Sequence, residues 1–224
     1  MCNEVFWAPL VQALPPAFDV RVADYGDASS ITAMAQAALD CAAPRFSLAG
    51  HSMGGRVALE VVRLAPDRVN QLILMDTGYL PLAAGDAGAL ERAGRVALLD
   101  TARRDGVRAM CTDWVKGMVH PARLSDTTLI NAILDMFATK DAARFACQID
   151  ALLSRPDAIP VLANLTIPTM LLCGRQDSWA GVAQHEAMQE LATRARLSVV
   201  EEAGHMVLME QPETTARAIL DFLG

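Results

Sequence analysis

A serine between two glycines, at the junction of a strand pattern and a helix pattern, most constrains how this chain can fold. It is the central residue of the run Gly50-His51-Ser52-Met53-Gly54. The mostly apolar residues 46–49 before it predict a buried parallel strand, and residues 57–64 after it continue at helical spacing. The sequence therefore predicts a sharp strand-to-helix turn with Ser52 at its tip.

Such a turn has a steric and a chemical consequence. It crowds the strand against the helix and strains the serine backbone, so Gly50 and Gly54 are predicted where a Cβ atom would collide. It also presents the Ser52 hydroxyl to a neighbouring base, and a serine attacks a carbonyl only when a base accepts its proton. We interpret Ser52 as a nucleophile; the alternative is a glycine-rich turn whose serine caps the next helix.

Two later segments repeat the order of an apolar run followed by a polar loop. Residues 168–177 end in Gly174-Arg175-Gln176-Asp177, and residues 197–206 contain Gly204-His205. Together with the Gly-x-Ser-x-Gly turn, these segments resemble the α/β-hydrolase fold family over nearly the whole chain. The resemblance implies an α/β fold, with a mostly parallel sheet flanked by helices, and a catalytic triad in the chain order Ser, Asp, His.

The resemblance also implies the roles of the site residues. His205 is expected to accept the proton of Ser52, and Asp177 to hold the imidazole in the right tautomer. The Met53 amide is expected to be an oxyanion donor. Asp76, which follows the apolar residues 71–75, is a second candidate for the acid, because some members of the fold place the carboxylate there.

The other histidines are assigned more modest roles. His51, next to the nucleophile, is predicted to contact the substrate or to pack in the turn. His120 and His185 are predicted to be surface residues. No histidines and carboxylates have the spacing of metal ligands, so we predict no metal and no cofactor.

After residue 78 the alternation of strand and helix patterns stops. Helical spacing is present over residues 90–104, 107–118, 125–138 and 141–154. The family implies a helical cap over the carboxyl edge of the sheet, which predicts a hydrolase core of residues 1–78 and 164–224 and a cap of residues 79–163. Trp114 and Phe137 are predicted to bind the substrate beneath this cap, although helical spacing alone also explains such residues as core.

The N-terminal region departs from the family. Residues 18–23 predict a strand and residues 30–42 a helix. Members have a further strand between that strand and the serine strand, ending in a His-Gly or Pro-Gly turn that supplies the second oxyanion amide. Residues 1–10 resemble the stretch after this turn. We therefore expect unpaired backbone groups on both flanks of the missing strand, and a functional start upstream of Met1 or an impaired protein.

Composition excludes several classes of partner. Lys plus Arg is 19 against 26 for Asp plus Glu, and the net charge of −7 argues against nucleic acid or an anionic membrane. No apolar run has the roughly 18 residues that a membrane helix needs. The five cysteines lack pairing spacing, which favours a cytoplasmic location. A length of 224 residues fits one enzyme domain with an insertion.

The expected function is that of a serine hydrolase. It would cleave a carboxylic ester, a thioester or a related acyl substrate through an acyl-enzyme on Ser52, and hydrolysis of a carbon–carbon bond by the same residues stays open. The alternative is a non-catalytic or degenerate hydrolase-fold protein that binds a ligand, suggested by the missing strand and amide.

Overall fold

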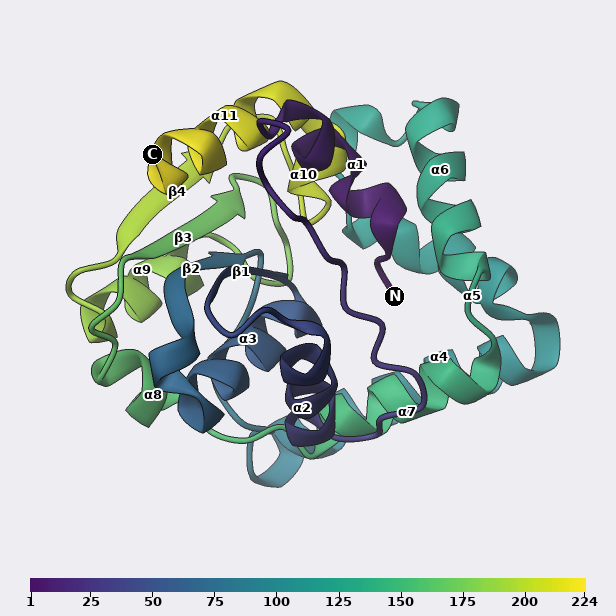
Figure 1. The fold of residues 1–224 in the computed structure, drawn as a ribbon. Helices are drawn as coiled ribbons and strands as arrows, with labels where there is room; N and C mark the ends of the chain where they lie inside the picture. The colour runs from purple at the N-terminus through teal and green to yellow at the C-terminus, as the bar shows by residue number, and fades with distance from the viewer.

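A four-stranded parallel sheet forms the centre of the computed structural model, which describes all 224 residues (Figure 1). The strands lie in the order β1-β2-β3-β4, and each neighbouring pair is parallel. Because the strands run the same way, their carboxyl ends meet at one edge, where open α/β sheets bind ligands. The predicted α/β fold is confirmed. The strands are β1 (Phe46–His51), β2 (Val69–Met75), β3 (Thr169–Gly174) and β4 (Arg196–Val200).

Helices cover both faces of the sheet, and the side chains of β2 alternate between two separate cores. Leu72 and Leu74 belong to a core shared with α2, α3, α8 and α9, whereas Ile73 and Met75 belong to a core shared with α1, α10 and α11. This is the two-residue period of a strand buried on both faces. The bounds are α1 (Glu4–Ala13), α2 (Ile31–Cys41), α3 (Met53–Leu64), η1 (Pro66–Arg68), α8 (Ile159–Ala163), α9 (Val182–Leu191), α10 (Val207–Glu210) and α11 (Pro212–Leu223).

Between β2 and β3 the chain forms helices only, as the spacing predicts. In Figure 1, α4 to α7 stand to one side of the sheet. Within this segment Arg155, after α7, joins α4 by donating to both carboxylate oxygens of Glu91 at 2.7 and 2.8 Å. The division of the chain at residues 79 and 163 stays a prediction. The elements are α4 (Gly85–Asp105), α5 (Val107–Trp114), η2 (Val115–Gly117), η3 (Pro121–Arg123), α6 (Thr127–Ala138) and α7 (Ala142–Leu153).

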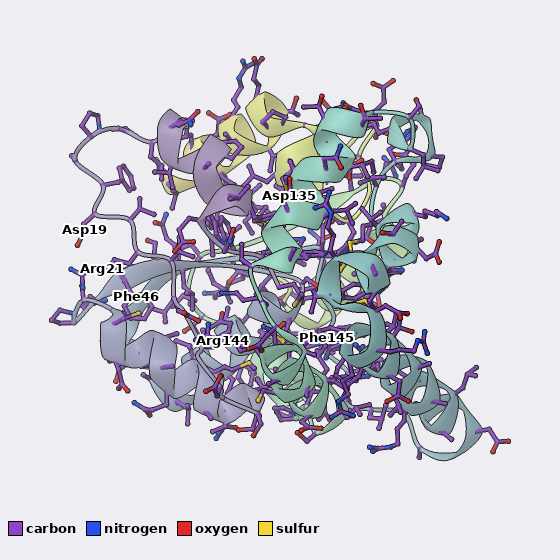
Figure 2. All side chains as sticks on the ribbon, turned by 90° about the vertical axis from the view of Figure 1, so that its right-hand side faces the viewer. Asp19, Arg21, Phe46, Asp135, Arg144 and Phe145 are labelled. Carbon is purple, nitrogen blue, oxygen red and sulfur yellow. The ribbon has the colours of Figure 1, made fainter.

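The segment between α1 and α2 corrects one prediction. Residues 18–23 form no strand, and Phe18 and Val20 are 45% and 41% exposed. Figure 2 shows Asp19 and Arg21 at the outer rim of the molecule. The apolar alternation is local, whereas a strand needs a neighbour to take its backbone hydrogen bonds, and β1 pairs only with β2. Unpaired strand edges were expected on two strands, and the structure has only one of these two strands, β1, whose outer edge pairs with no strand.

None of the helices combines the length and the apolar character that crossing a bilayer requires.

Candidate active site

Ser52 follows β1 directly and lies in a strained turn. Its φ of 54° is in the left-handed region, which is uncommon for a residue other than glycine. Backbone contacts hold this conformation, because the Ser52 N–H donates to the Met75 carbonyl at 2.9 Å and Thr77 Oγ1 donates to the Ser52 carbonyl at 2.6 Å. Backbone strain that its surroundings maintain tends to occur at functional sites.

At two positions of this turn, neighbouring atoms leave no room for a Cβ atom, so glycine is required. A Cβ on Gly50 would overlap the Gly54 carbonyl, and a Cβ on Gly55 would lie 2.5 Å from Thr77 Oγ1. The prediction of a collision at Gly54 is wrong, because a Cβ there would meet only the Tyr25 hydroxyl, at an ordinary 3.7 Å. The carbonyl of Gly54 faces Gly50, whereas the Cβ position of Gly54 makes only this ordinary contact.

These approaches make a matched pair of variants informative. Gly50→Ala is expected to lower the free energy of unfolding by about 2 to 3 kcal/mol, because backbone must shift to admit the methyl group. Gly54→Ala is expected to change it by less than about 1 kcal/mol, because alanine favours the helix and meets no backbone atom. Urea unfolding followed by circular dichroism measures both, and equal losses would contradict the geometry.

Three side chains from three strand ends form one chain of hydrogen bonds. Ser52 Oγ lies 2.9 Å from His205 Nε2, and His205 Nδ1 lies 2.9 Å from Asp177 Oδ2. A carboxylate only accepts, so Nδ1 carries the proton and Nε2 is left to accept from the serine hydroxyl. His205 and Asp177 are buried. The structure thus brings together the three residues proposed from the sequence.

Asp177 is held in its ionised form. Burial opposes ionisation, but the hydrogen bond from His205 and those from the amides of Trp179 and Ala180, at 2.8 and 3.1 Å, outweigh it and keep the pKa of Asp177 at about 2. A carboxylate at this position stabilises a positive charge on the adjacent imidazole.

Asp76, the second candidate acid, occupies a different environment. It is fully buried with a φ of 44°, its Oδ1 accepts the Gly174 N–H at 2.9 Å, and its Oδ2 has no hydrogen-bond partner. Burial, and then the charge of Asp177, raise the pKa of Asp76 well above its usual range. The carboxylate that contacts His205 is that of Asp177.

His51 packs against the His205 loop, which agrees with the alternative of packing in the turn, and its contact with a substrate stays a prediction. Its Nε2 lies 2.7 Å from the His205 carbonyl and therefore carries the proton. Its Nδ1 faces Cys2 Sγ at 3.6 Å, and its ring stacks on Phe6 with centroids 4.2 Å apart. Burial lowers the pKa of His51 to about 3, so the ring stays neutral. His51 thus ties the end of β1 to the loop that carries His205.

His185 is fully buried, so the prediction of a surface position is wrong. The Thr77 N–H donates to His185 Nε2 at 3.4 Å, and Nδ1 lies 3.1 Å from the Gly181 carbonyl. Backbone groups thus satisfy both ring nitrogens, and a sequence pattern does not reveal this. His120 is half-buried and accepts the Ala122 amide through Nδ1. No cluster of three histidine, cysteine or acidic side chains is arranged to hold a metal ion.

Met53 is the first residue of α3, so its N–H has no acceptor within the helix. The N-terminus of this 12-residue helix adds a partial positive charge beside Ser52. The Met53 amide is therefore available to a negative charge that develops next to the serine.

Glu210 braces the loop of His205, and the sequence pattern did not single it out. Its Oε1 accepts the Gly204 N–H at 2.8 Å, and its Oε2 accepts the His120 N–H at 2.6 Å. Burial raises the pKa of this carboxyl group. Since His120 lies in the helical segment between β2 and β3, Glu210 joins that segment to the His205 loop.

The aromatic residues of the helical segment lie at two depths. Phe137 is buried and packs against the half-buried Trp114 at a centroid distance of 5.9 Å, so Phe137 belongs to the core rather than to an open pocket wall. Trp179, which the sequence did not indicate, stacks on Trp114 at 5.4 Å and lies 4.9 Å from the His205 ring. Trp179 is thus the aromatic residue nearest the triad histidine.

A parallel sheet whose strand ends carry a Ser–His–Asp chain, with the serine on a strand-to-helix turn, defines an α/β-class hydrolase. The chain belongs to the alpha/beta hydrolase family, whose profile matches residues 10–218.

Similar proteins include one named as an esterase and two named as synthases. Pimeloyl-[acyl-carrier protein] methyl ester esterase from Photobacterium profundum is 25% identical over 99% of this chain and 90% of its own length. A 2-succinyl-6-hydroxy-2,4-cyclohexadiene-1-carboxylate synthase from Serratia proteamaculans is 28% identical over 80% of this chain and 68% of its own. Polyketide synthase ThaQ from Burkholderia thailandensis is 30% identical over 79% of this chain, which spans only 8% of that protein.

Solved structures show the same fold. A thermophilic esterase from Thermogutta terrifontis superposes with a TM-score of 0.85, at 24% identity, over 99% of this chain and 85% of that one. An enol-lactonase from Burkholderia xenovorans superposes with a TM-score of 0.82, at 21% identity, over 99% of this chain and 87% of that one.

Proposed function

We propose that the protein is a serine hydrolase that cleaves a carboxylic ester, a thioester or a related small acyl substrate. The observation that carries this proposal is the unbroken hydrogen-bond chain from Ser52 through His205 to Asp177, with both contacts at 2.9 Å. The names of several relatives, which include an esterase of a methyl ester, support an ester as the substrate.

The steps follow from the tautomer of His205. His205 Nε2 takes the hydroxyl proton as Ser52 Oγ attacks the acyl carbon, and Asp177 stabilises the imidazolium. The Met53 amide stabilises the oxyanion. The imidazolium then protonates the leaving oxygen, the bond from the acyl carbon to that oxygen breaks, and water hydrolyses the acyl-enzyme by the same route.

A fluorophosphonate probe tests this proposal directly. Such a probe phosphonylates only an activated serine, so it is expected to label the folded protein at Ser52, and Ser52→Ala is expected to abolish the labelling. Mass spectrometry of the labelled peptide locates the modification. A folded protein that resists labelling would instead support a ligand-binding member of the family without catalysis.

The remaining expectations concern the surroundings. We propose that the protein acts without nucleic acid or membrane as partner, on the grounds of its net charge of −7. A cytoplasmic location remains a proposal that rests on its five cysteines, which are all free.

A further inference from the structure

Trp179 is an exposed apolar side chain held rigidly beside the triad histidine. The residue is 41% exposed although tryptophan is among the largest apolar residues. Its ring lies 4.9 Å from the His205 ring at an interplanar angle of 55°, and its amide donates to Asp177 Oδ1 at 2.8 Å. The residue is therefore tied to the acid through its backbone and to the base through its ring.

The segment between β2 and β3 fixes the indole from the other side. Trp114 stacks on it with centroids 5.4 Å apart and planes 26° apart. A Cβ on Gly117 would come within 3.2 to 3.5 Å of three indole atoms, so the indole edge lies along this glycine, and Ser178 Oγ donates to the Gly117 carbonyl at 2.9 Å. An aromatic surface that is both exposed and immobilised costs little conformational entropy when it binds a ligand.

The chemistry of His205 determines which part of a substrate meets this surface. His205 Nε2 donates its proton to the leaving oxygen when the acyl carbon–oxygen bond breaks, so that oxygen lies next to Nε2 in the transition state. The oxyanion lies on the other side of the acyl carbon, towards the Met53 amide. The group bonded to the leaving oxygen is therefore the part of the substrate that the reaction brings to His205, the histidine whose ring lies 4.9 Å from that of Trp179.

We propose that Trp179, backed by Trp114, forms the subsite for the leaving alcohol, and that it selects esters of aromatic alcohols over those of small aliphatic alcohols. The assignment rests on the proposed serine-hydrolase function. Rings prefer offset or edge-to-face contact with an indole, and each such contact adds to the gain from burying apolar surface. The acyl group has no part in this contact, so Trp179 discriminates in the step that forms the acyl-enzyme and not in the step that hydrolyses it.

Two ester series test this assignment. One keeps the acetyl group and varies the alcohol from methyl to butyl to benzyl; the other keeps the ethyl alcohol and varies the acyl chain from acetyl to octanoyl. Trp179→Ala is expected to lower kcat/KM for benzyl acetate about tenfold more than kcat/KM for methyl acetate. The ranking of acyl chains is expected to stay unchanged. Trp179→Phe keeps a ring and is expected to retain most of the preference.

Phe18→Ala is the matched control, because Phe18 is 45% exposed and lies on the irregular segment between α1 and α2. It is expected to leave both series unchanged. An equal loss of kcat/KM for benzyl and methyl acetate in Trp179→Ala, or a changed ranking confined to the acyl series, would overturn the subsite. Wild-type protein that neither hydrolyses any ester nor reacts with fluorophosphonate would overturn the proposed function itself.

A second measurement uses the wild-type protein alone and stands even if Trp179→Ala does not fold. An alcohol that occupies the subsite can attack the acyl-enzyme in place of water, because deacylation by an alcohol is the reverse of acylation. Benzyl alcohol is therefore expected to capture the acyl group from ethyl acetate about tenfold better than butanol does at equal concentration. Gas chromatography measures the yields of benzyl acetate and butyl acetate. Equal yields of the two esters would overturn the assignment.

Discussion

Ser52→Ala is expected to lower ester turnover roughly ten-thousand-fold or more, and His205→Ala and Asp177→Asn to cause losses of the same kind. The three groups form one proton-transfer unit, since Ser52 Oγ and Asp177 Oδ2 each contact a nitrogen of the same imidazole at 2.9 Å. Removing one member already disables the unit. The double and triple variants are therefore expected to lose little more than the worst single variant, in contrast to independent residues, whose losses multiply.

The measurement is kcat with a p-nitrophenyl ester, together with thermal unfolding of each variant to establish that it is folded. Asp76→Asn is the matched control, because Asp76 is a buried acid after the neighbouring strand that does not contact His205. It is expected to retain far more activity than Asp177→Asn. The reverse order, with Asp177→Asn fully active, would transfer the role of the acid to Asp76.

Acid is expected to destabilise the fold through His51. Burial lowers the pKa of His51 to about 3 in the folded protein, against 6.5 for an imidazole exposed to water. Between these values the unfolded chain binds the proton and the folded protein does not, so stability rises with pH across this window. Above about pH 6.5 His51 is neutral in both states and does not lower the free energy of unfolding. Below that pH the free energy of unfolding falls, because only the unfolded chain takes up the proton. At pH 4.5 the loss is about 3 kcal/mol.

His51→Gln isolates this contribution, because the glutamine amide can donate to the His205 carbonyl but does not titrate. At pH 7.5 the variant is expected to be about 1 to 2 kcal/mol less stable than the wild type, since it loses the stack on Phe6. At pH 4.5 the variant is expected to be the more stable of the two, because the wild type loses about 3 kcal/mol there and the variant does not. Urea unfolding at both pH values gives the four free energies, and His120→Gln controls for loss of a histidine as such. A constant difference at the two pH values would show that His51 protonation does not limit acid stability.

The sequence was most informative where a structural requirement is local. The turn at Ser52 depends on a glycine, a strand and a helix that are adjacent in the chain, so it is visible as a pattern, and β1 and α3 occupy the predicted place. The helices α4 to α7 follow from apolar spacing within each segment, and the side chains of Asp126 and Asp141 cap α6 and α7. The apolar spacing predicted one helix over residues 107–118 and did not show that α5 ends at Trp114 and that η2 follows it.

Apart from the collision expected at Gly54, the errors arise where a residue depends on partners that are distant in the chain. Residues 18–23 alternate like a strand, but no neighbouring strand accepts their backbone hydrogen bonds. Helix α1 contains Pro9 and has no clear apolar period, so its contact with His51 through Phe6 could not be foreseen. His185, Glu210 and Trp179 acquire their roles from backbone groups or rings supplied by other elements, and no local pattern encodes such contacts.

The buried carboxylate of Glu210 limits how new substrate specificities could be engineered into this protein. Exchanging the residues between β2 and β3 for those of a relative is an obvious way to build a chimaera. The graft must supply an amide where His120 donates at 2.6 Å and a carbonyl where Met118 accepts the Met206 N–H at 3.1 Å. A donor segment without the amide leaves Glu210 Oε2 without its partner, and one without the carbonyl leaves the Met206 N–H unpaired next to His205. The chimaera would then lose activity because the loop that carries the base, His205, is no longer braced, however well the new pocket fits the substrate.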